Sequence, residues 1–209
     1  PMLIRCKSNN LFNFTFESDF WRAMVYIDKT FNLNSLEDLK MAYQTGIGLA
    51  EFHLICTDLD YLKLKDNIKN FHNTKYFIEE YISTLKNFKL LRLDRNENFR
   101  ILNLIDSLTK HTQFVECVLK SFNKDSLEHN IIHGDPKLNN FLFDLQYKYV
   151  VSLIDLDTVS YGCFLIDLAD CIRSICNLAG EDPINIEEVR FDIKSCMHFL
   201  KGYLSQTNK

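Results

Sequence analysis

One polar loop between two short apolar runs constrains the fold of this chain more than any other stretch. The loop reads HGDPKLNN and covers residues 133–140, between Ile131–Ile132 and the run FLF. A second apolar run, VVSLI, comes shortly afterwards and ends on Asp155. Two runs of β-forming residues joined by a polar turn near 144–147 predict a β-hairpin. Such a hairpin brings Asn140 beside Asp155, although they are fifteen positions apart.

Hydrophobic periodicity places this hairpin inside a mainly helical body. Residues 1–28 form short apolar or alternating runs separated by polar turns, which predicts a small antiparallel meander. From Ser35 onward the apolar residues fall at helical spacing. Ser35, with Asp38 three residues later, suits a helix start. The other segments with helical spacing are residues 74–87, 98–110, 112–122, 165–178 and 186–204. The expected fold is therefore α+β, with a small sheet before a helical body.

Composition excludes several classes of protein. With 209 residues, of which 46% are hydrophobic and 25% charged, the chain suits an ordinary globular protein. Its formal net charge of -4 argues against nucleic acid as a partner. No apolar run approaches the ~18 residues of a membrane span, and no signal-peptide pattern opens the sequence. Seven cysteines without a C-x-x-C pair favour reduced, mostly buried thiols in a cytoplasmic protein.

Gly46 and Gly48 form a G-x-G pair that looks like the start of a phosphate-binding loop. No third glycine follows at the required spacing, and the pair lies inside a helical pattern instead of between a strand and a helix. We therefore expect these glycines to let helices pack closely.

The loop and the end of the hairpin supply the groups that phosphoryl transfer requires. The transition state of that reaction carries diffuse negative charge, so catalysis depends on positioning and charge neutralisation. Asp135 is the candidate base that orients an acceptor hydroxyl and takes its proton. Asn140 and Asp155 offer the hard oxygen ligands that Mg²⁺ prefers. Lys137, two residues after Asp135, is a second candidate catalytic group because it can reach a phosphate oxygen.

The string H-G-D-x-K-x-x-N followed by I-D-x-D resembles the catalytic and metal loops of the kinase-like aminoglycoside phosphotransferase superfamily. The similarity is closest to N-acetylhexosamine 1-kinase-like proteins, in which FWRAMVYID, AYQTGIGLAEFH, FHNT, DPKLNNFLFD and IDLDTV…DLADCIRSICN occur in this order. The resemblance implies a protein-kinase-like fold, with 1–28 as a remnant of the N-terminal lobe and hinge and 29–209 as the helical C-lobe. It implies an enzyme that transfers the γ-phosphate of ATP, with Mg²⁺, to a hydroxyl of a sugar or amino sugar.

The resemblance also assigns roles to individual residues of the loop. Asp135 becomes the base, and Asn140 and Asp155 become the magnesium ligands. His133 braces the loop by hydrogen bonding. Asp167 either caps the backbone of the catalytic loop or caps its own helix.

In this family, nucleotide binding involves the segment that corresponds to the start of this sequence. The main chain of Met24, Tyr26 and Asp28 is implied to meet adenine, whereas strand packing equally accounts for the side chains. Family members carry a fuller N-terminal lobe with a lysine that pairs with phosphates, and Lys7 lies in a turn that leaves no space for the partner helix. The chain is therefore expected to be the catalytic portion of a larger kinase, without the last C-terminal helices, and to bind ATP weakly.

Three further residues are candidates for contacts to the acceptor substrate: Asp157, Arg173 and His72. An i,i+3 salt bridge from Arg173 to Asp170 is the alternative for the arginine. A packing role is the alternative for His72.

Two other functions stay open on the sequence. One is phosphorylation of an aminoglycoside or another small alcohol, since Asp157, Asp167 and Asp170 would suit a cationic acceptor. The other is a truncated, non-catalytic kinase fold that serves as a binding module, against which the complete catalytic set argues. A partner chain or an oligomer that covers an exposed sheet over residues 1–28 is a further expectation.

Overall fold

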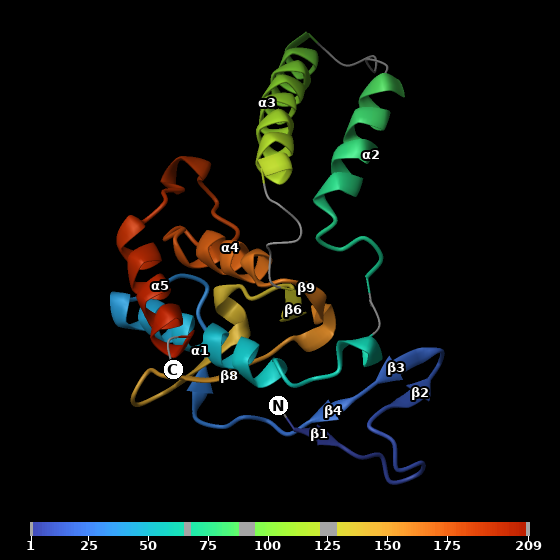
Figure 1. The fold of residues 1–209 in the computed structure, drawn as a ribbon, viewed down its shortest axis with the longest axis vertical. Coiled ribbons are helices and arrows are strands. Elements are labelled where there is room, and N and C mark those ends of the chain that lie inside the picture. The colour runs from blue at the N-terminus through green and yellow to red at the C-terminus, as the bar shows by residue number, and fades with distance from the viewer. Residues whose placement is uncertain (1, 65–67, 88–94, 122–128, 208–209) are drawn as a thin grey trace. The chain divides into compact units, whose positions relative to one another are not determined.

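The computed structural model describes residues 2–64, 68–87, 95–121 and 129–207 (Figure 1). The chain divides into two compact units, one formed by 1–67 with 130–209 and the other by 68–129. Each unit is described by itself. The expected boundary after residue 28 concerns the lobes of a kinase fold and stays a prediction.

Short antiparallel strands open the first unit, as the sequence predicts. β1 (Leu3–Ile4) pairs with β4 (Ala23–Met24), and β2 (Phe14–Phe16) pairs with β3 (Asp19–Trp21). The expected single meander is wrong, because these strands form two separate two-stranded ladders. The chain leaves one ladder and enters the other at Arg22, which lies between β3 and β4.

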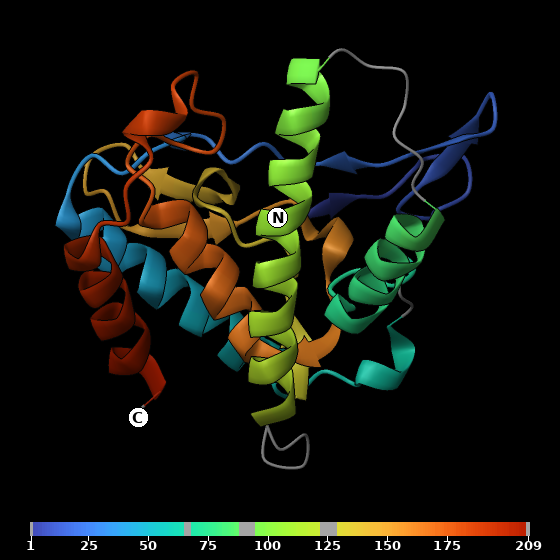
Figure 2. The ribbon, with the colours of Figure 1, turned by 90° about the horizontal axis from the view of Figure 1, so that it is seen from above.

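The helical body of the first unit is built on α1 (Leu39–Cys56) and α5 (Ile193–Thr207). Figure 2 shows both helices, with α4, on one side of the hairpin strands. A Cβ atom at Gly46 would lie 2.1 Å from a carbonyl oxygen of α5, and one at Gly202 would lie 2.0 Å from a carbonyl oxygen of α1. Glycine at both places therefore lets the two backbones touch, which confirms the packing role predicted for Gly46.

The predicted hairpin forms and gains a third strand. β7 (Phe141–Asp144) pairs with β8 (Val150–Leu153), and β5 (Thr30–Phe31) pairs with β7 on its other edge. The sequence analysis missed β5, because two residues are too short to show a period. A Cβ atom at Gly48 would lie 2.7 Å from the side chain of Val150. Gly48 thus fits α1 against the hairpin sheet, and the helix–helix role expected for it is wrong.

The polar loop and the segment after the hairpin are joined by a small two-stranded sheet. Its strands are β6 (His129–Ile132) and β9 (Ser160–Cys163). α4 (Phe164–Ile175) continues directly from β9. The helix predicted over 165–178 is therefore present, and it ends three residues earlier than expected.

Two helices begin later than predicted, each at an aspartate. Asp38 is the N-cap of α1, since its carboxylate accepts from the Met41 amide at 2.8 Å, so the predicted start at Ser35 is wrong. Asp192 accepts from the amide of Ser195 at 2.9 Å before α5. The predicted helix over 186–204 therefore separates into a 3-10 turn, Ile186–Glu188, and α5.

The second unit contains α2 (Thr74–Asn87) and α3 (Arg95–Ser121). The two helices predicted over 98–110 and 112–122 are one continuous helix, because His111, the residue between them, is neither a glycine nor a proline. The Tyr81 hydroxyl donates to the Ile105 carbonyl at 3.0 Å and fastens α2 to α3.

The core of the first unit lies between α1, α4, α5 and the hairpin sheet. Its largest fully buried side chains are Met41, Leu49, Phe141, Phe143, Ile175 and Phe199. The six cysteines whose side chains are described are free thiols, and four of them are buried. Among the described residues, no helix combines the length and the apolar character that a membrane span needs.

Replacing Phe143 with Ala should lower the free energy of unfolding by about 3–5 kcal/mol, because the ring is fully buried and its loss leaves a cavity. Urea denaturation followed by circular dichroism measures the effect. Leu145→Ala, at an exposed position just beyond the same strand, is the matched control and should change stability little. Equal losses in both variants would contradict the placement of the core.

Candidate active site

The polar loop needs glycine at its second position. Gly134 has a φ of +86°, and a Cβ atom there would lie 2.5 Å from the carbonyl oxygen of Thr158. A side chain would therefore be strained and would also strike the neighbouring loop. The Thr158 hydroxyl donates to the His133 carbonyl at 2.8 Å. These contacts hold the loop at 133–140 against the segment that follows the hairpin.

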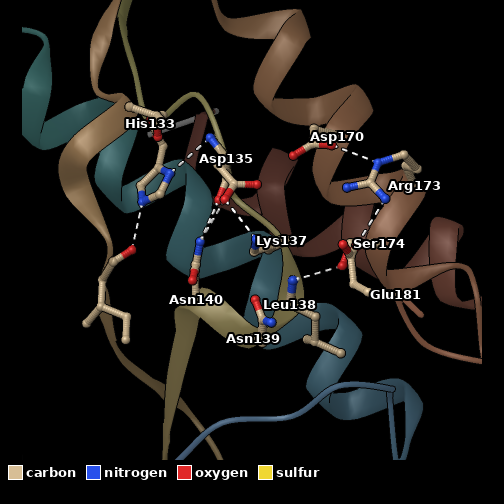
Figure 3. Close-up of polar contacts among 12 residues, drawn as sticks. His133, Asp135, Lys137, Leu138, Asn139, Asn140, Asp170, Arg173, Ser174 and Glu181 are labelled. Atoms are coloured by element: carbon tan, nitrogen blue, oxygen red, sulfur yellow. Dashed lines mark hydrogen bonds and ion pairs between the residues drawn. The ribbon is translucent and has the colours of Figure 1, made fainter. Parts of the chain in front are cut away.

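His133 braces the loop from inside, as expected from the sequence. Its ring is fully buried, with Nε2 3.0 Å from the Ile154 carbonyl oxygen, while Nδ1 accepts from the Asp135 amide at 3.2 Å (Figure 3). Burial lowers the pKa of His133, and the nearby carbonyl and carboxylates only partly oppose this effect. The ring is therefore neutral, with its proton on Nε2.

The Asp135 carboxylate is partly exposed and is held by two side chains. Lys137 Nζ lies 3.1 Å from Oδ2, and the amide nitrogen of Asn140 lies 3.5 Å from the same oxygen. The other oxygen points away from both of these groups (Figure 3). The pKa of Lys137 is raised, chiefly by its hydrogen bond to Asp135. Asp135 therefore has one anchored oxygen and one directed away from the anchoring groups, as a base requires.

The hairpin brings Asn140 close to Asp155, as its register demands. The Ile154 amide donates to the Asn140 carbonyl at 2.9 Å, so Asp155 directly follows a residue that is bonded to Asn140, just beyond the end of β8. The Asn140 side-chain nitrogen donates to the Asp135 carbonyl at 2.8 Å, which leaves its amide oxygen for another ligand. Asp155 has φ +64° and ψ +61°, an uncommon left-handed backbone for a residue other than glycine.

These donors suit a magnesium ion in chemical type. Mg²⁺ takes one or two protein oxygens and completes its shell with water and phosphate oxygens. Asn140 and Asp155 supply one amide oxygen and one carboxylate. Within 2–64, 68–87, 95–121 and 129–207, no group of three His, Cys, Asp or Glu side chains forms a metal-binding cluster.

Asp167 holds the backbone of the loop. Its buried carboxylate accepts from the amides of His133 and Gly134 at 2.7 and 2.8 Å. Of the two roles that the sequence left open, the first is therefore present. The second is wrong, since Cys163 occupies the N-cap position of α4.

His53 is a member of this network that the sequence analysis missed. Its Nε2 lies 2.8 Å from Asp167 Oδ2, and its Nδ1 lies 2.9 Å from the Tyr203 hydroxyl. The signal available in the sequence was a histidine among apolar residues of a helix, next to Phe52. That pattern alone does not identify its partner.

A second group of charges lies beside the loop, on and after α4. Arg173 pairs with Asp170 at 2.8 Å, as the alternative from the sequence predicted, and also with Glu181 at 3.0 Å (Figure 3). Ser174 accepts from the Leu138 amide at 3.0 Å and ties α4 to the loop. A hollow of about 210 Å³ opens here, and its walls include Arg173, Ser174, Asn177, Glu181, Arg190 and Phe191. The sequence analysis missed Glu181, Arg190 and Phe191.

The remaining predicted site residues are less closely tied to this centre. Asp157 forms an ion pair with Arg22. Met24 pairs with Leu3 in a ladder, and the side chain of Tyr26 is exposed. The Asp28 carboxylate accepts a hydrogen bond from the backbone amide of Lys29. The nucleotide-binding and substrate roles of these residues stay predictions.

His72 lies in the second unit. Its ring packs on Phe71, with the ring centres 4.2 Å apart. This contact agrees with the packing alternative. The acceptor-binding role of His72 stays a prediction.

Comparison with known proteins gives a family and a structural neighbour. The model of the phosphotransferase enzyme family matches residues 14–200, which include both loops described above. Among solved structures, the chain is similar to an aminoglycoside-3'-phosphotransferase of type VIII at 18% sequence identity. The TM-score is 0.49, and the alignment covers 100% of this chain and 67% of that one. The family match confirms the predicted fold class.

The stability of the protein should depend on the protonation of His133. Because its pKa is lowered in the folded state, the unfolded chain binds the proton more readily. The contribution of the neutral ring to the free energy of unfolding is complete above about pH 6.5, the ordinary pKa of histidine. It is lost as the pH falls through the lower pKa of the folded state. Between pH 7.5 and 5, urea denaturation should show a smaller loss of unfolding free energy in His133→Gln than in the parent protein. An unchanged pH dependence in that variant would contradict a buried neutral ring.

The left-handed backbone of Asp155 gives a second test. Asp155→Gly should be more stable than Asp155→Ala by about 1 kcal/mol, because the left-handed backbone is strained for alanine but not for glycine. Both variants lose the carboxylate and should lose phosphotransferase activity alike. The same two substitutions at Val151, inside β8, form the control, and there alanine should be the more stable. The reverse order at Asp155 would contradict its backbone conformation.

Proposed function

The chain belongs to the phosphotransferase enzyme family, and from this premise we propose that it transfers the γ-phosphate of ATP to a hydroxyl group of a sugar or amino sugar. One observation carries the proposal. The loop at 133–140 presents a carboxylate, a lysine and an amide oxygen together, and the hairpin adds a second carboxylate beside them. Phosphoryl transfer needs this combination of proton acceptor, cation and oxygen ligands.

Asp135 is the proposed base. The oxygen that points away from Lys137 and Asn140 accepts the proton of the acceptor hydroxyl, while the ion pair with Lys137 keeps the carboxylate oriented. The Lys137 ammonium has three hydrogens, so it can donate to a phosphate oxygen while it stays paired with Asp135. His133 and Asp167 act indirectly, because they fix the backbone that carries Asp135.

Asn140 and Asp155 are the proposed ligands of Mg²⁺. Bound there, the ion would neutralise the negative charge of the phosphates. The amide oxygen of Asn140 is directed by the bond that its nitrogen makes to the Asp135 carbonyl. The backbone of Asp155 is fixed by the end of the hairpin. The main chain of Met24, Tyr26 and Asp28 is the proposed contact for adenine.

The hollow beside α4 is the proposed site for the acceptor. It borders the loop through Ser174, and Glu181 is close enough to raise the pKa of Lys137. The ring of Phe191 can pack on the apolar face of a sugar. Arg190 has no ion pair within the described ranges, whereas Glu181 is already paired with Arg173. With Asp170, which also pairs with Arg173, two arginines balance two carboxylates here. A hollow without excess negative charge suits a neutral acceptor, such as an N-acetylhexosamine, better than a polycationic aminoglycoside.

A partner for the first strands is a separate proposal. The side chains of Phe14, Phe16, Phe20 and Trp21 on β2 and β3 are exposed. A partner chain or a second copy that covers them would remove a large apolar surface from water. Light scattering that shows only monomers over a wide concentration range would argue against a second copy.

The decisive experiment is Mg-ATP turnover with a panel of acceptors. Asp135→Asn should lower kcat by roughly 10²–10⁴-fold, the usual contribution of a general base. Asp182→Asn removes an exposed carboxylate outside the loop and should leave kcat unchanged. N-acetylglucosamine should be phosphorylated in preference to glucosamine and kanamycin.

Each outcome separates the candidate functions. Turnover that survives Asp135→Asn would remove the assignment of the base. A preference for kanamycin would identify an aminoglycoside phosphotransferase. Failure to turn over any acceptor, together with nucleotide binding, would favour a non-catalytic binding module.

A further inference from the structure

We propose that Tyr203 on α5 is a positioning residue of the catalytic loop, held in place by the glycine contact between α1 and α5. Only the kinetic test of this inference rests on the proposed function. Its structural basis is a chain of hydrogen bonds that runs from Tyr203 through His53 to Asp167 and the loop.

The series of hydrogen bonds ends on a carboxylate whose two oxygens both accept hydrogen bonds. Asp167 Oδ2 accepts from the His133 amide and from His53, and Oδ1 accepts from the Gly134 amide. The side chain has no exposed surface. A buried carboxylate is tolerated only when donors surround it, so the loss or displacement of one donor weakens the others.

The acceptor character of Asp167 decides which atom of His53 faces it. An ionised carboxylate can only accept, so His53 Nε2 must carry a hydrogen. The other ring nitrogen, Nδ1, lies 2.9 Å from the Tyr203 hydroxyl and forms a hydrogen bond with it. Both side chains are more than nine-tenths buried, so water is not a ready substitute. Tyr203 thus fixes the ring orientation in which His53 donates to Asp167.

The close approach of the two helices sets this distance. Gly202 precedes Tyr203, and a Cβ atom on Gly202 would lie 2.0 Å from the Tyr43 carbonyl oxygen. On the facing helix, a Cβ atom on Gly46 would lie 2.7 Å from the Tyr203 amide nitrogen. A methyl group at either position must push α5 away from α1. The Tyr203 hydroxyl would then move beyond hydrogen-bonding distance of His53.

The effect on the reaction follows from the position of the two loop amides. His133 and Gly134 directly precede Asp135, so their bonds to Asp167 orient the backbone that carries the base. A loosened Asp167 should therefore affect the chemical step more than the binding of either substrate.

Tyr203→Phe removes a single oxygen atom and is the main test. We expect kcat to fall about five- to tenfold, the equivalent of one hydrogen bond, with both KM values unchanged. Hydrogen exchange of the His133 and Gly134 amides, measured by NMR, should become faster. Lys201→Ala, on the exposed side of α5, is the matched control and should change neither quantity.

A double-mutant cycle distinguishes positioning from general loosening. Gly202→Ala should lower kcat in the parent protein but have much less effect when Tyr203→Phe is already present. Independent, additive losses would overturn the proposed route through the hydroxyl. Unchanged amide exchange in Tyr203→Phe would overturn the whole inference. Because amide exchange needs no turnover, this result stands apart from any failure of the proposed function.

Discussion

The structure of the active centre depends on one buried carboxylate. Asp167 has no contact with solvent, and its carboxylate accepts hydrogen bonds from the amides of His133 and Gly134 and from the ring of His53. An isolated charge in this position would be very costly, and the surrounding donors are what make it stable. In return, the carboxylate fixes a stretch of backbone that has no regular secondary structure. The direction of the Asp135 side chain follows from that backbone.

Two further contacts extend this order to the hairpin. His133 donates to the Ile154 carbonyl, and Thr158 donates to the His133 carbonyl. The loop with the candidate base and the loop with the candidate metal ligand therefore share hydrogen bonds on both sides of Asp155. A displacement of either loop therefore moves the other. Gly134 has to be a glycine because its backbone is left-handed and because a side chain there would meet the Thr158 carbonyl oxygen. Rigidity of this kind is what a reaction governed by positioning requires.

The sequence predicted the parts of this site that lie in one continuous pattern. Hairpin pairing follows from two apolar runs and a turn, so the meeting of Asn140 with Asp155 was predictable. The i,i+3 pair of Arg173 with Asp170 was equally local. His53 and Tyr203 were missed, since their partners are more than a hundred positions away in sequence. Glu181 was missed because it lies beyond the end of α4, so helical spacing does not link it to Arg173 eight positions earlier. The start of α1 was misplaced because Ser35 and Asp38 are both good caps, and only hydrogen bonding selects between them.

By itself the sequence determined that short strands precede a helical body, that a hairpin lies within that body, and the chemical identity of the loop. These depend on short-range periodicity, turn residues and the spacing of functional groups along the chain. Only the tertiary structure decided which of Asp167's two expected roles applies, and that α1 and α5 touch through Gly46 and Gly202. It also decided that a hollow with Arg190 and Phe191 borders the loop. Such features depend on how distant helices pack, and packing is set by the complementary shapes of many side chains at once.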